Sequence, residues 1–407
     1  MRLAARAVEG RLNADRSDQA RPVAPCRCGA EARYAGRRPK TFQTALGEIT
    51  LQRAYFHCPR CQGGFCPRDL ALGLQASSLS PAVMRMVGLT AAMVSFAETS
   101  ELLAELAGVA VDAKQAERSA EALGREIAAD ERAVVEGEPA GAATLYLGMD
   151  GTGVPLRPAE LQGRPGKQPD GSARTREAKL VTVWSAEGRD ADGTPVRDPG
   201  SVTYSAAIES AANRDTDPGP SPFAMRVDRE ARRRGFDQAD RRVVLGDGAP
   251  WIWNLAEERF PGAVQIVDRY HAKQHLSEVA KAIYGAGSDL ATQWARQRHD
   301  ELDTGQIDAL LAALNEHAQA NEEARKCKDY LTHNRHRMRY PVFHAEGLCT
   351  STGVVEAGCK LIVGTRLKRA GMRWTLAGAD AIIALRACKL SGRFEDFWQR
   401  RSTRAVA

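Results

Sequence analysis

The sequence predicts an α/β fold, with a core of strands and helices that follows a cysteine-rich hairpin and a helical segment. Apolar runs typical of strands alternate with helical patterns in the order βββαβαβ between residues 144 and 268. Residues 271–345 then show helical spacing of mostly polar residues, which predicts an all-helical insertion before a last helix. A chain of 407 residues has room for the two or three domains that this order implies.

The composition is that of a folded protein, with 43% hydrophobic and 27% charged residues. It excludes wholesale disorder and a fibrous repeat. No apolar run approaches the roughly 18 residues that a membrane span needs, and the N-terminus lacks the apolar stretch of a signal peptide. We therefore expect a cytoplasmic protein with no membrane partner, whose nine cysteines are thiols or metal ligands rather than disulfides.

Positive charge is concentrated at the two ends of the chain. The net charge is +6, but residues 1–75 carry +7, residues 76–146 carry −6 and residues 357–407 carry +8. Basic ends attract polyanions, and nucleic acid is the default candidate, although a solvated basic surface without a partner has the same composition.

Residues 1–24 form a polar, Arg-rich N-terminal arm, and residues 25–72 form a small unit with cysteine pairs at both ends. Alternating apolar and polar residues on either side of Gly47 predict two short strands joined by a turn. Four thiolates brought together by such a hairpin suit a closed, structural Zn²⁺ site. The predicted ligands are Cys26, Cys28, Cys58 and Cys61, with His57 and Cys66 as nearby substitutes; four reduced cysteines without metal are the alternative.

Basic and aromatic residues are interleaved between the cysteine pairs. Arg37, Arg38 and Lys40 are candidate DNA contacts, because Arg and Lys bind phosphates and the aromatic side chains beside them can pack on bases or sugars. The alternative is that the aromatic residues only fill the small core of this unit.

Residues 73–140 predict a helical subdomain, with helical spacing over residues 79–135 and with Gly108 and Gly124 as helix breakers. Part of it can be interpreted as a helix-turn-helix that reads DNA. Since this region is acidic, protein–protein assembly is an equally weighted interpretation.

The core begins after a Gly- and Pro-containing stretch. Its first part spans residues 141–275, the helical insertion 276–345, and the last helix with a basic tail 346–407. Strands are expected at 144–150, 178–185, 201–208, 241–247 and 263–268, with helices from Pro222 and from Pro250.

Two carboxylates end buried strands in the same way. Asp150 closes LYLGMD and Asp247 closes VVLGD, and each is followed by glycine. A carboxylate at the tip of a buried strand is costly unless it is paired or binds a cation, so the two together suggest a shared Mg²⁺ site. Taken singly, each Asp-Gly is ordinary turn chemistry. In a βββαβαβ sheet the first and fourth strands are neighbours, as in the ribonuclease H fold, which places Asp150 beside Asp247.

A third carboxylate completes the pattern. Glu356 lies in STGVVEA, where a helix is expected to start with this side chain turned inward. Three carboxylates can hold two hard cations, which activate the attacking oxygen and stabilise the leaving oxygen in phosphoryl transfer.

Three segments carry a family resemblance: MDGTGVPLR, VVLGDGAPWIWNLAEERFPGAVQIVDRYHAKQHL and STGVVEAGCKLIVGTRLKRAGMRW. They resemble the ISKra-type transposases of bacterial insertion sequences, a DDE group with a Mutator-like layout, and the resemblance covers residues 25–390. It implies that Asp150, Asp247 and Glu356 are the DDE triad. It also implies that Asp268 and His271 form an auxiliary D-x2-H motif that orients DNA or supports the site without binding metal.

Further DNA contacts are expected near the third carboxylate, where the alternative is a solvated basic face. They are Lys360, Arg366, Lys368, Arg369 and Arg373. Trp251, Trp253 and Trp374 could stack on a flipped base but are more often core residues, and we leave them unassigned.

The sequence thus predicts a DNA transposase that binds the terminal inverted repeats of its element and target DNA as a homo-oligomer. Two Mg²⁺ or Mn²⁺ ions per active site and one structural Zn²⁺ are the expected cofactors. The alternatives are a non-catalytic zinc-ribbon regulator that binds DNA, and a ribonuclease H-like nuclease without strand transfer.

Overall fold

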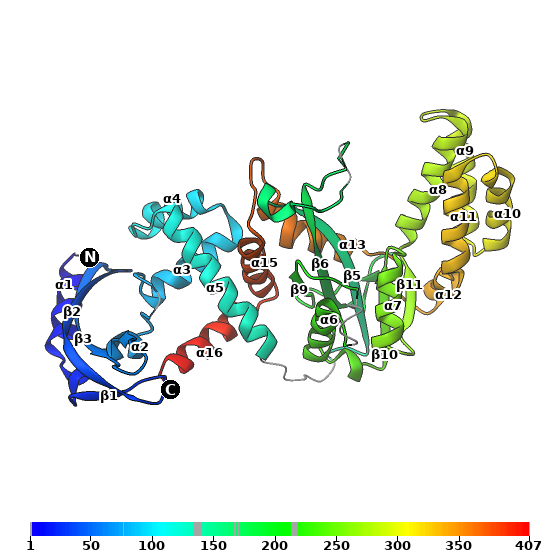
Figure 1. The fold of residues 1–407 in the computed structure, drawn as a ribbon. Helices are drawn as coiled ribbons and strands as arrows, with labels where there is room; N and C mark the ends of the chain where they lie inside the picture. Colours follow the sequence, from blue (N-terminus) through cyan, green and yellow to red (C-terminus); the bar gives the residue numbers. More distant parts are fainter. Residues whose placement is uncertain are drawn as a thin grey trace. The chain divides into compact units, whose positions relative to one another are not determined.

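The computed structural model describes residues 2–75, 77–133, 141–166, 168–169, 171–212 and 219–406. The chain divides into two compact units, one formed by Met1–Asp130 with Asp380–Ala407 and the other by Glu131–Ala379 (Figure 1). The sequence analysis assigns residues 346–407 to the core, whereas contacts group the last 28 residues of the chain with the N-terminal unit.

The N-terminal unit begins with a helix and an antiparallel sheet of strand order β1-β2-β3-β4. A long hairpin dominates the sheet: β2 pairs with β3 from Arg33↔His57 at its open end to Thr44↔Gly47 at the turn. Both strands are longer than predicted, and their pairing brings the two cysteine segments together at the open end. The elements are α1 (Arg2–Ala14), β1 (Val23–Pro25), β2 (Glu31–Thr44), β3 (Gly47–His57), β4 (Gly64–Phe65) and α2 (Pro67–Ala71).

Three helices follow, as the spacing predicts: α3 (Pro81–Met93), α4 (Phe96–Ala107) and α5 (Ala113–Ala133). Ser95 and Glu98 form a capping box at the start of α4. Gly108 ends α4 in the left-handed conformation, as expected of a breaker. Gly124 does not break a helix: it lies inside α5, where a Cβ would overlap the backbone carbonyl of Ala381. Its small size serves close packing between helices.

This packing makes position 124 sensitive to substitution. We expect Gly124→Ala to destabilise the protein by about 1–3 kcal/mol, because the added methyl group meets backbone that cannot move aside as a side chain would. Gly10→Ala in α1 is the matched control, since nothing lies within 4 Å of a Cβ there and alanine is the better helix former. Urea unfolding of both variants tests the expectation; equal stability would contradict it.

The C-terminal helices α15 (Leu376–Leu390) and α16 (Phe394–Val406) carry five of the eleven Lys and Arg residues of segment 357–407. Part of that charge is neutralised within the same unit. Arg400 pairs with Asp130 at 2.7 Å, and Arg401 with Glu126 at 2.6 Å. Helix α5 is therefore an internal partner of the basic tail through Asp130 and Glu126, which reduces the charge that the tail offers to a ligand.

The second unit contains a five-stranded sheet of order β11-β10-β5-β6-β9 (Figure 1). β5 runs parallel to β10, and β10 to β11, whereas β6 is antiparallel to both β5 and β9. The strands and the first two helices follow the predicted order βββαβαβ, and a small hairpin of β7 (Gly188–Arg189) and β8 (Pro195–Val196) was not predicted. The elements are β5 (Thr144–Pro155), β6 (Thr175–Ser185), β9 (Thr203–Ala207), α6 (Pro222–Arg233), β10 (Arg241–Gly246), α7 (Pro250–Arg259) and β11 (Val264–Val267).

The region between the sheet and the third carboxylate is helical, as predicted. It comprises α8 (Arg269–Tyr284), α9 (Asp289–Asp303), α10 (Ile307–Ala318), α11 (Glu322–Asn334) and α12 (Tyr340–Ala345). After it come α13 (Gly353–Cys359), a π-helical turn at Lys360–Gly364 and the short α14 (Thr365–Leu367). None of the helices within the described ranges is long and apolar enough to cross a membrane.

Candidate active site and metal centre

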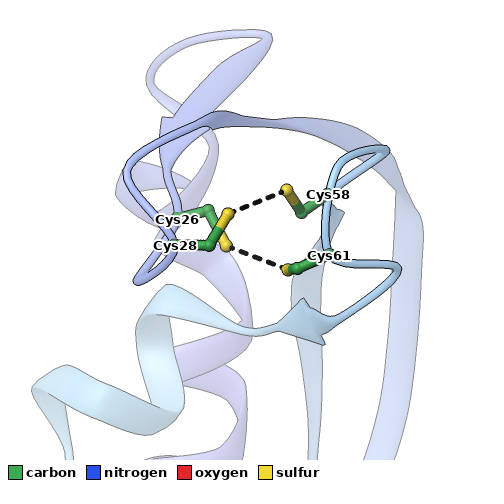
Figure 2. A group of neighbouring side chains, drawn as sticks. All are labelled: Cys26, Cys28, Cys58 and Cys61. Atoms are coloured by element: carbon green, nitrogen blue, oxygen red, sulfur yellow. Dashed lines mark hydrogen bonds between the residues drawn. The ribbon is translucent and has the colours of Figure 1, made fainter.

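The four predicted cysteine ligands lie together at the open end of the β2–β3 hairpin (Figure 2). Their sulfur atoms all lie within 4.8 Å of one another, and the Cys26–Cys61 and Cys28–Cys58 Sγ pairs are each 3.6 Å apart. Four thiolates at about 2.3 Å from one Zn²⁺ ion stand about 3.8 Å apart in a tetrahedron. The arrangement therefore fits a zinc ion with no open position for water.

Backbone donors make one of these thiols acidic. The N–H groups of Cys61 and Arg60 donate to the Cys58 sulfur and lower the pKa of that thiol to about 6, so a thiolate forms there readily. Cys66 is not part of the cluster. It is buried at the start of α2, where burial raises the pKa of its thiol, and this suits a packing role.

The two carboxylates predicted at strand ends lie on neighbouring strands. Asp247 directly follows the end of β10, but β5 continues past Asp150 to Pro155, so the prediction that Asp150 closes its strand was wrong. β5 and β10 pair in parallel with Gly148 opposite Leu245, so Asp150 and Asp247 each stand two residues beyond this pair, at the same edge of the sheet. Asp247 Oδ1 accepts a hydrogen bond from the Ala249 N–H at 2.9 Å, which shapes the turn after β10. The prediction that these two aspartates are neighbours agrees with this register.

Asp150 lies in an environment that opposes its negative charge. Burial raises the pKa of this carboxyl, and the charges of Asp247 and Glu356 raise it further; the Gly151 N–H and the Cys359 thiol oppose the shift by donating to it. The Gly151 N–H lies 2.6 Å from Oδ1. The three carboxylates of the predicted triad are thus close enough to repel one another.

Helix α13 lies directly on the sheet and carries the third carboxylate. A Cβ at Gly148 would overlap Val355, and a Cβ at Gly358 would press on Leu180, so small residues on both elements permit the close approach. Glu356 is in the first turn, as predicted, but its side chain is exposed and Val355 takes the inward position. The expectation of an inward Glu356 was wrong, because the apolar neighbour fills the space above the sheet.

The residue types at this edge fit hard cations, which prefer carboxylate oxygens. Among the residues that the structure describes, the cysteines are the one group of at least three potential ligands that all lie within 4.8 Å of one another. The carboxylates are spread more widely. A site for two ions about 3.5–4 Å apart does not require each ligand to touch every other.

Asp268 joins β10, the start of α8 and the segment before α13 through hydrogen bonds. Its Oδ1 accepts from the His271 N–H at 2.7 Å and caps α8, and its Oδ2 accepts from the Thr352 hydroxyl at 2.5 Å and from the Thr352 N–H. Its own N–H donates to the Gly246 carbonyl of β10. With 1% of its surface exposed, Asp268 has no access to DNA, and its contacts support the start of the helix that carries Glu356.

Removing one of these bonds is expected to loosen that helix. We expect Thr352→Val to cost about 1–2 kcal/mol of stability, because the buried Asp268 carboxylate loses a hydroxyl donor while the side-chain shape is kept. Ser351→Ala, one residue earlier, is the control, because it removes only an exposed hydrogen bond that the Ser351 hydroxyl accepts from the Gly353 N–H. Thermal unfolding that shows no greater loss for Thr352→Val than for Ser351→Ala would contradict this role.

His271 begins a row of rings that leads towards Asp247. The centroids of the His271 and His275 rings are 4.7 Å apart, and those of the His275 ring and the Tyr330 ring of α11 are 4.6 Å apart. The Tyr330 hydroxyl donates to the Asp247 carbonyl oxygen at 2.9 Å. Burial and the neighbouring His271 lower the pKa of His275, which favours a neutral imidazole. No motif in the sequence indicates Tyr330, which lies 83 residues from Asp247 along the chain.

The predicted DNA contacts near Glu356 are not all accessible. Arg366 is fully buried with its guanidinium over the Trp374 ring at 5.2 Å, so it has no access to a phosphate. Lys368 is exposed and donates to the Thr152 hydroxyl of β5 at 2.5 Å, two residues beyond Asp150. Lys360, Arg369 and Arg373 are exposed.

The predicted DNA contacts of the β2–β3 hairpin also differ in how accessible their charged groups are. Arg37 donates to both carboxylate oxygens of Asp18, at 3.0 and 3.2 Å, and is therefore committed within the unit. Arg38 is exposed and lies over the Tyr55 ring at 3.5 Å. Lys40 donates to the Ser77 carbonyl at 2.9 Å.

The unassigned tryptophans lie in the protein interior or against it. Trp374 is buried and its indole N–H donates to the Leu367 carbonyl at 3.0 Å. Trp253 is buried beneath the Arg337 guanidinium, and Trp251 packs against Phe223. The core interpretation of Trp253 and Trp374 agrees with this burial.

Comparisons with known proteins identify one matching protein family and one distantly similar solved structure. No curated protein matches the chain. Among solved structures, the Drosophila P element transposase strand transfer complex is similar at 11% identity and a TM-score of 0.28, over 83% of this chain and 86% of that chain. The sequence profile of an uncharacterised protein family, UPF0236, matches residues 30–400. Since this match spans the chain from the cysteine hairpin to the last helix, the protein belongs to the UPF0236 family.

Proposed function

We propose that this protein is a metal-dependent DNA transposase of the DDE type. The observation that carries the proposal is the register of β5 and β10, which sets Asp150 and Asp247 at one edge of the sheet, with Glu356 close enough to raise the pKa of Asp150. Carboxylates that repel one another at one place in a fold are stabilised by bound cations, and such a cluster is suited to phosphoryl transfer.

The sheet supports a ribonuclease H-like core. With β5, β6, β9, β10 and β11 numbered 1 to 5 in chain order, the order across the sheet is 5-4-1-2-3, and the second strand is antiparallel to the other four. This puts the first strand next to the fourth, which is the arrangement expected of a ribonuclease H-like sheet from the βββαβαβ order. The helices α8–α12 are then an insertion ahead of the third carboxylate.

Each carboxylate has a role in the proposed reaction. Two Mg²⁺ or Mn²⁺ ions, when bound, supply activation of the attacking oxygen and stabilisation of the leaving oxygen. Asp150 and Asp247 hold the centre of the site from the sheet, and Glu356 completes it from α13. Asp268 fixes the start of α13 through Thr352, and Lys368 offers a cation beside β5.

The partners that we propose are the inverted repeats at the ends of the element and the target DNA, bound by a homo-oligomer that pairs two ends. The sequence resemblance to ISKra-type transposases supports this assignment. A nuclease without strand transfer would use the same carboxylates, so the products of the reaction, rather than the geometry of the site, separate the two functions.

The test is a cleavage and strand-transfer assay on labelled DNA that carries the flanking ends of the gene's own locus, with Mg²⁺ or Mn²⁺ and a supercoiled target plasmid. The proposal predicts metal-dependent nicks at the ends and covalent joining of the new 3′-hydroxyl to the plasmid. Nicks at the ends without joining to the plasmid would support a nuclease that lacks strand transfer. DNA binding without nicks in the presence of either metal would support a non-catalytic regulator that binds DNA.

A further inference from the structure

A groove in the second unit lies beyond the end of the carboxylate site. It encloses about 850 Å³, and the described residues that line it are 155, 156, 158, 161–164 and 171–174, from the end of β5 and the segment after it, and 371–373, from the loop before Trp374. β5 continues from Asp150 to Pro155, so the groove begins about 17 Å along the strand from the carboxylate, at about 3.3 Å per residue. The backbone of Trp374 joins the two walls by hydrogen bonding to Pro155 and Arg157.

The groove is basic. Arg164, Arg174 and Arg373 line it and are exposed, and no acidic residue is among the described residues of its wall. None of the three guanidinium groups forms an ion pair or a side-chain hydrogen bond with the part of the chain that the structure describes. This contrasts with the arginines at the end of the chain, which are paired with α5.

Apart from Gln162, the other described residues of the wall are apolar or small. Leu156, Leu161 and Met372 contribute apolar surface, and Gly163, Gly171 and Gly371 leave backbone accessible. Cations above an apolar floor suit a ligand that has phosphates on one side and sugar or base surface on the other. A small inorganic anion would not use the apolar part.

We propose that this groove binds the backbone of the DNA that enters or leaves the carboxylate site. Lys368, at Thr152, lies between the carboxylates and the groove along β5, so cations continue from one to the other. The separation of about 17 Å corresponds to about five base pairs of duplex. The inference rests on the proposed function, since it makes the groove the path of the substrate rather than a separate site.

The experiment measures binding apart from cleavage. A fluorescein-labelled DNA duplex is titrated with the full-length protein in EDTA over a range of NaCl concentrations, for the wild type and for the groove variant Arg164→Ala/Arg174→Ala/Arg373→Ala. Loss of three phosphate contacts is expected to weaken binding at least about tenfold and to lower the slope of log K against log [NaCl] by about 3.

Two variants control for charge and shape. Arg232→Ala/Arg296→Ala/Arg325→Ala removes the same charge from exposed positions outside the groove, and is expected to bind nearly as the wild type does. The groove variant with lysine at all three positions is expected to keep most of the affinity, because a phosphate contact needs the charge. A groove variant that binds like the wild type, or a control that loses as much affinity, would overturn the inference.

The outcomes distinguish a failure of the groove inference from a failure of the transposase proposal. If the wild type cleaves and joins DNA while the groove variant binds with unchanged salt dependence, the groove inference fails and the transposase proposal stands. If the groove variant loses binding but the wild type never cleaves with Mg²⁺ or Mn²⁺, the transposase proposal fails and the DNA groove stands. An RNA duplex of the same sequence that binds more tightly than the DNA, with the same loss in the groove variant, would overturn the choice of DNA.

Discussion

Asp247→Asn is expected to abolish DNA cleavage and strand transfer while DNA binding is retained. The amide keeps the shape of the side chain and can still accept from the Ala249 N–H, so the turn after β10 is preserved. What is lost is the negative charge beside Asp150, on which a cation would depend. We expect the rate to fall by at least about 100-fold, as is usual when a principal electrostatic element of an active site is removed.

Asp240→Asn is the matched control. Asp240 is exposed and directly precedes β10, at the end of the strand away from Asp247, so this change removes the same charge without touching the site. The account requires full activity from Asp240→Asn and intact duplex binding by Asp247→Asn. An Asp247→Asn protein that still cuts DNA would remove Asp247 from the triad.

Cys58→Ser is expected to release zinc and unfold the open end of the β2–β3 hairpin. Cys58 supplies the most acidic thiol of the cluster, and a serine hydroxyl is a poor ligand for Zn²⁺. Structural zinc contributes about 10–16 kcal/mol to the folding of small zinc-finger peptides, and without it only a small apolar cluster around Ala32, Ala54 and Phe56 remains at this end. Metal analysis should find one equivalent of zinc in the wild type and none in the variant, with faster proteolysis in residues 25–72.

Cys66→Ser separates the cluster from other cysteines of the same region. Cys66 is buried beside α2 and outside the group of four, so its variant is expected to keep zinc. Zinc retained by Cys58→Ser would show that the cluster is not the metal centre. Zinc lost from Cys66→Ser as well as from Cys58→Ser would show that Cys66 is a ligand.

The sequence predicts the parts of this fold that local pattern controls. The hairpin, the three helices after it, the five strands and the helical insertion follow from periodicity and from turn residues. That Asp150 and Asp247 are neighbours follows from the order of the elements, because that order favours the pairing of β5 with β10. The four cysteines were predictable since their spacing places two pairs at one end of a hairpin.

What the sequence could not show depends on contacts between distant segments. Gly124 has the sequence signature of a helix breaker, and only the carbonyl of Ala381 on another helix explains why it lies inside one. Arg366 belongs to a basic run, and its burial against Trp374 depends on how the chain turns after the π-helical segment. The Asp268–Thr352 bond joins residues 84 positions apart. The ISKra-type assignment stays a prediction, since the family that the chain matches is uncharacterised.

The central claim is that the Asp247 side chain binds a catalytic metal ion, and metal specificity tests it most directly. In Asp247→Cys a soft thiolate replaces a hard carboxylate, so Mg²⁺ is held poorly while Mn²⁺ accepts sulfur more readily. The account predicts that wild-type protein cleaves the labelled element end with either ion, and that Asp247→Cys is inactive with Mg²⁺ and regains cleavage with Mn²⁺. An Asp247→Cys protein that cleaves as well with Mg²⁺ as the wild type does would contradict it.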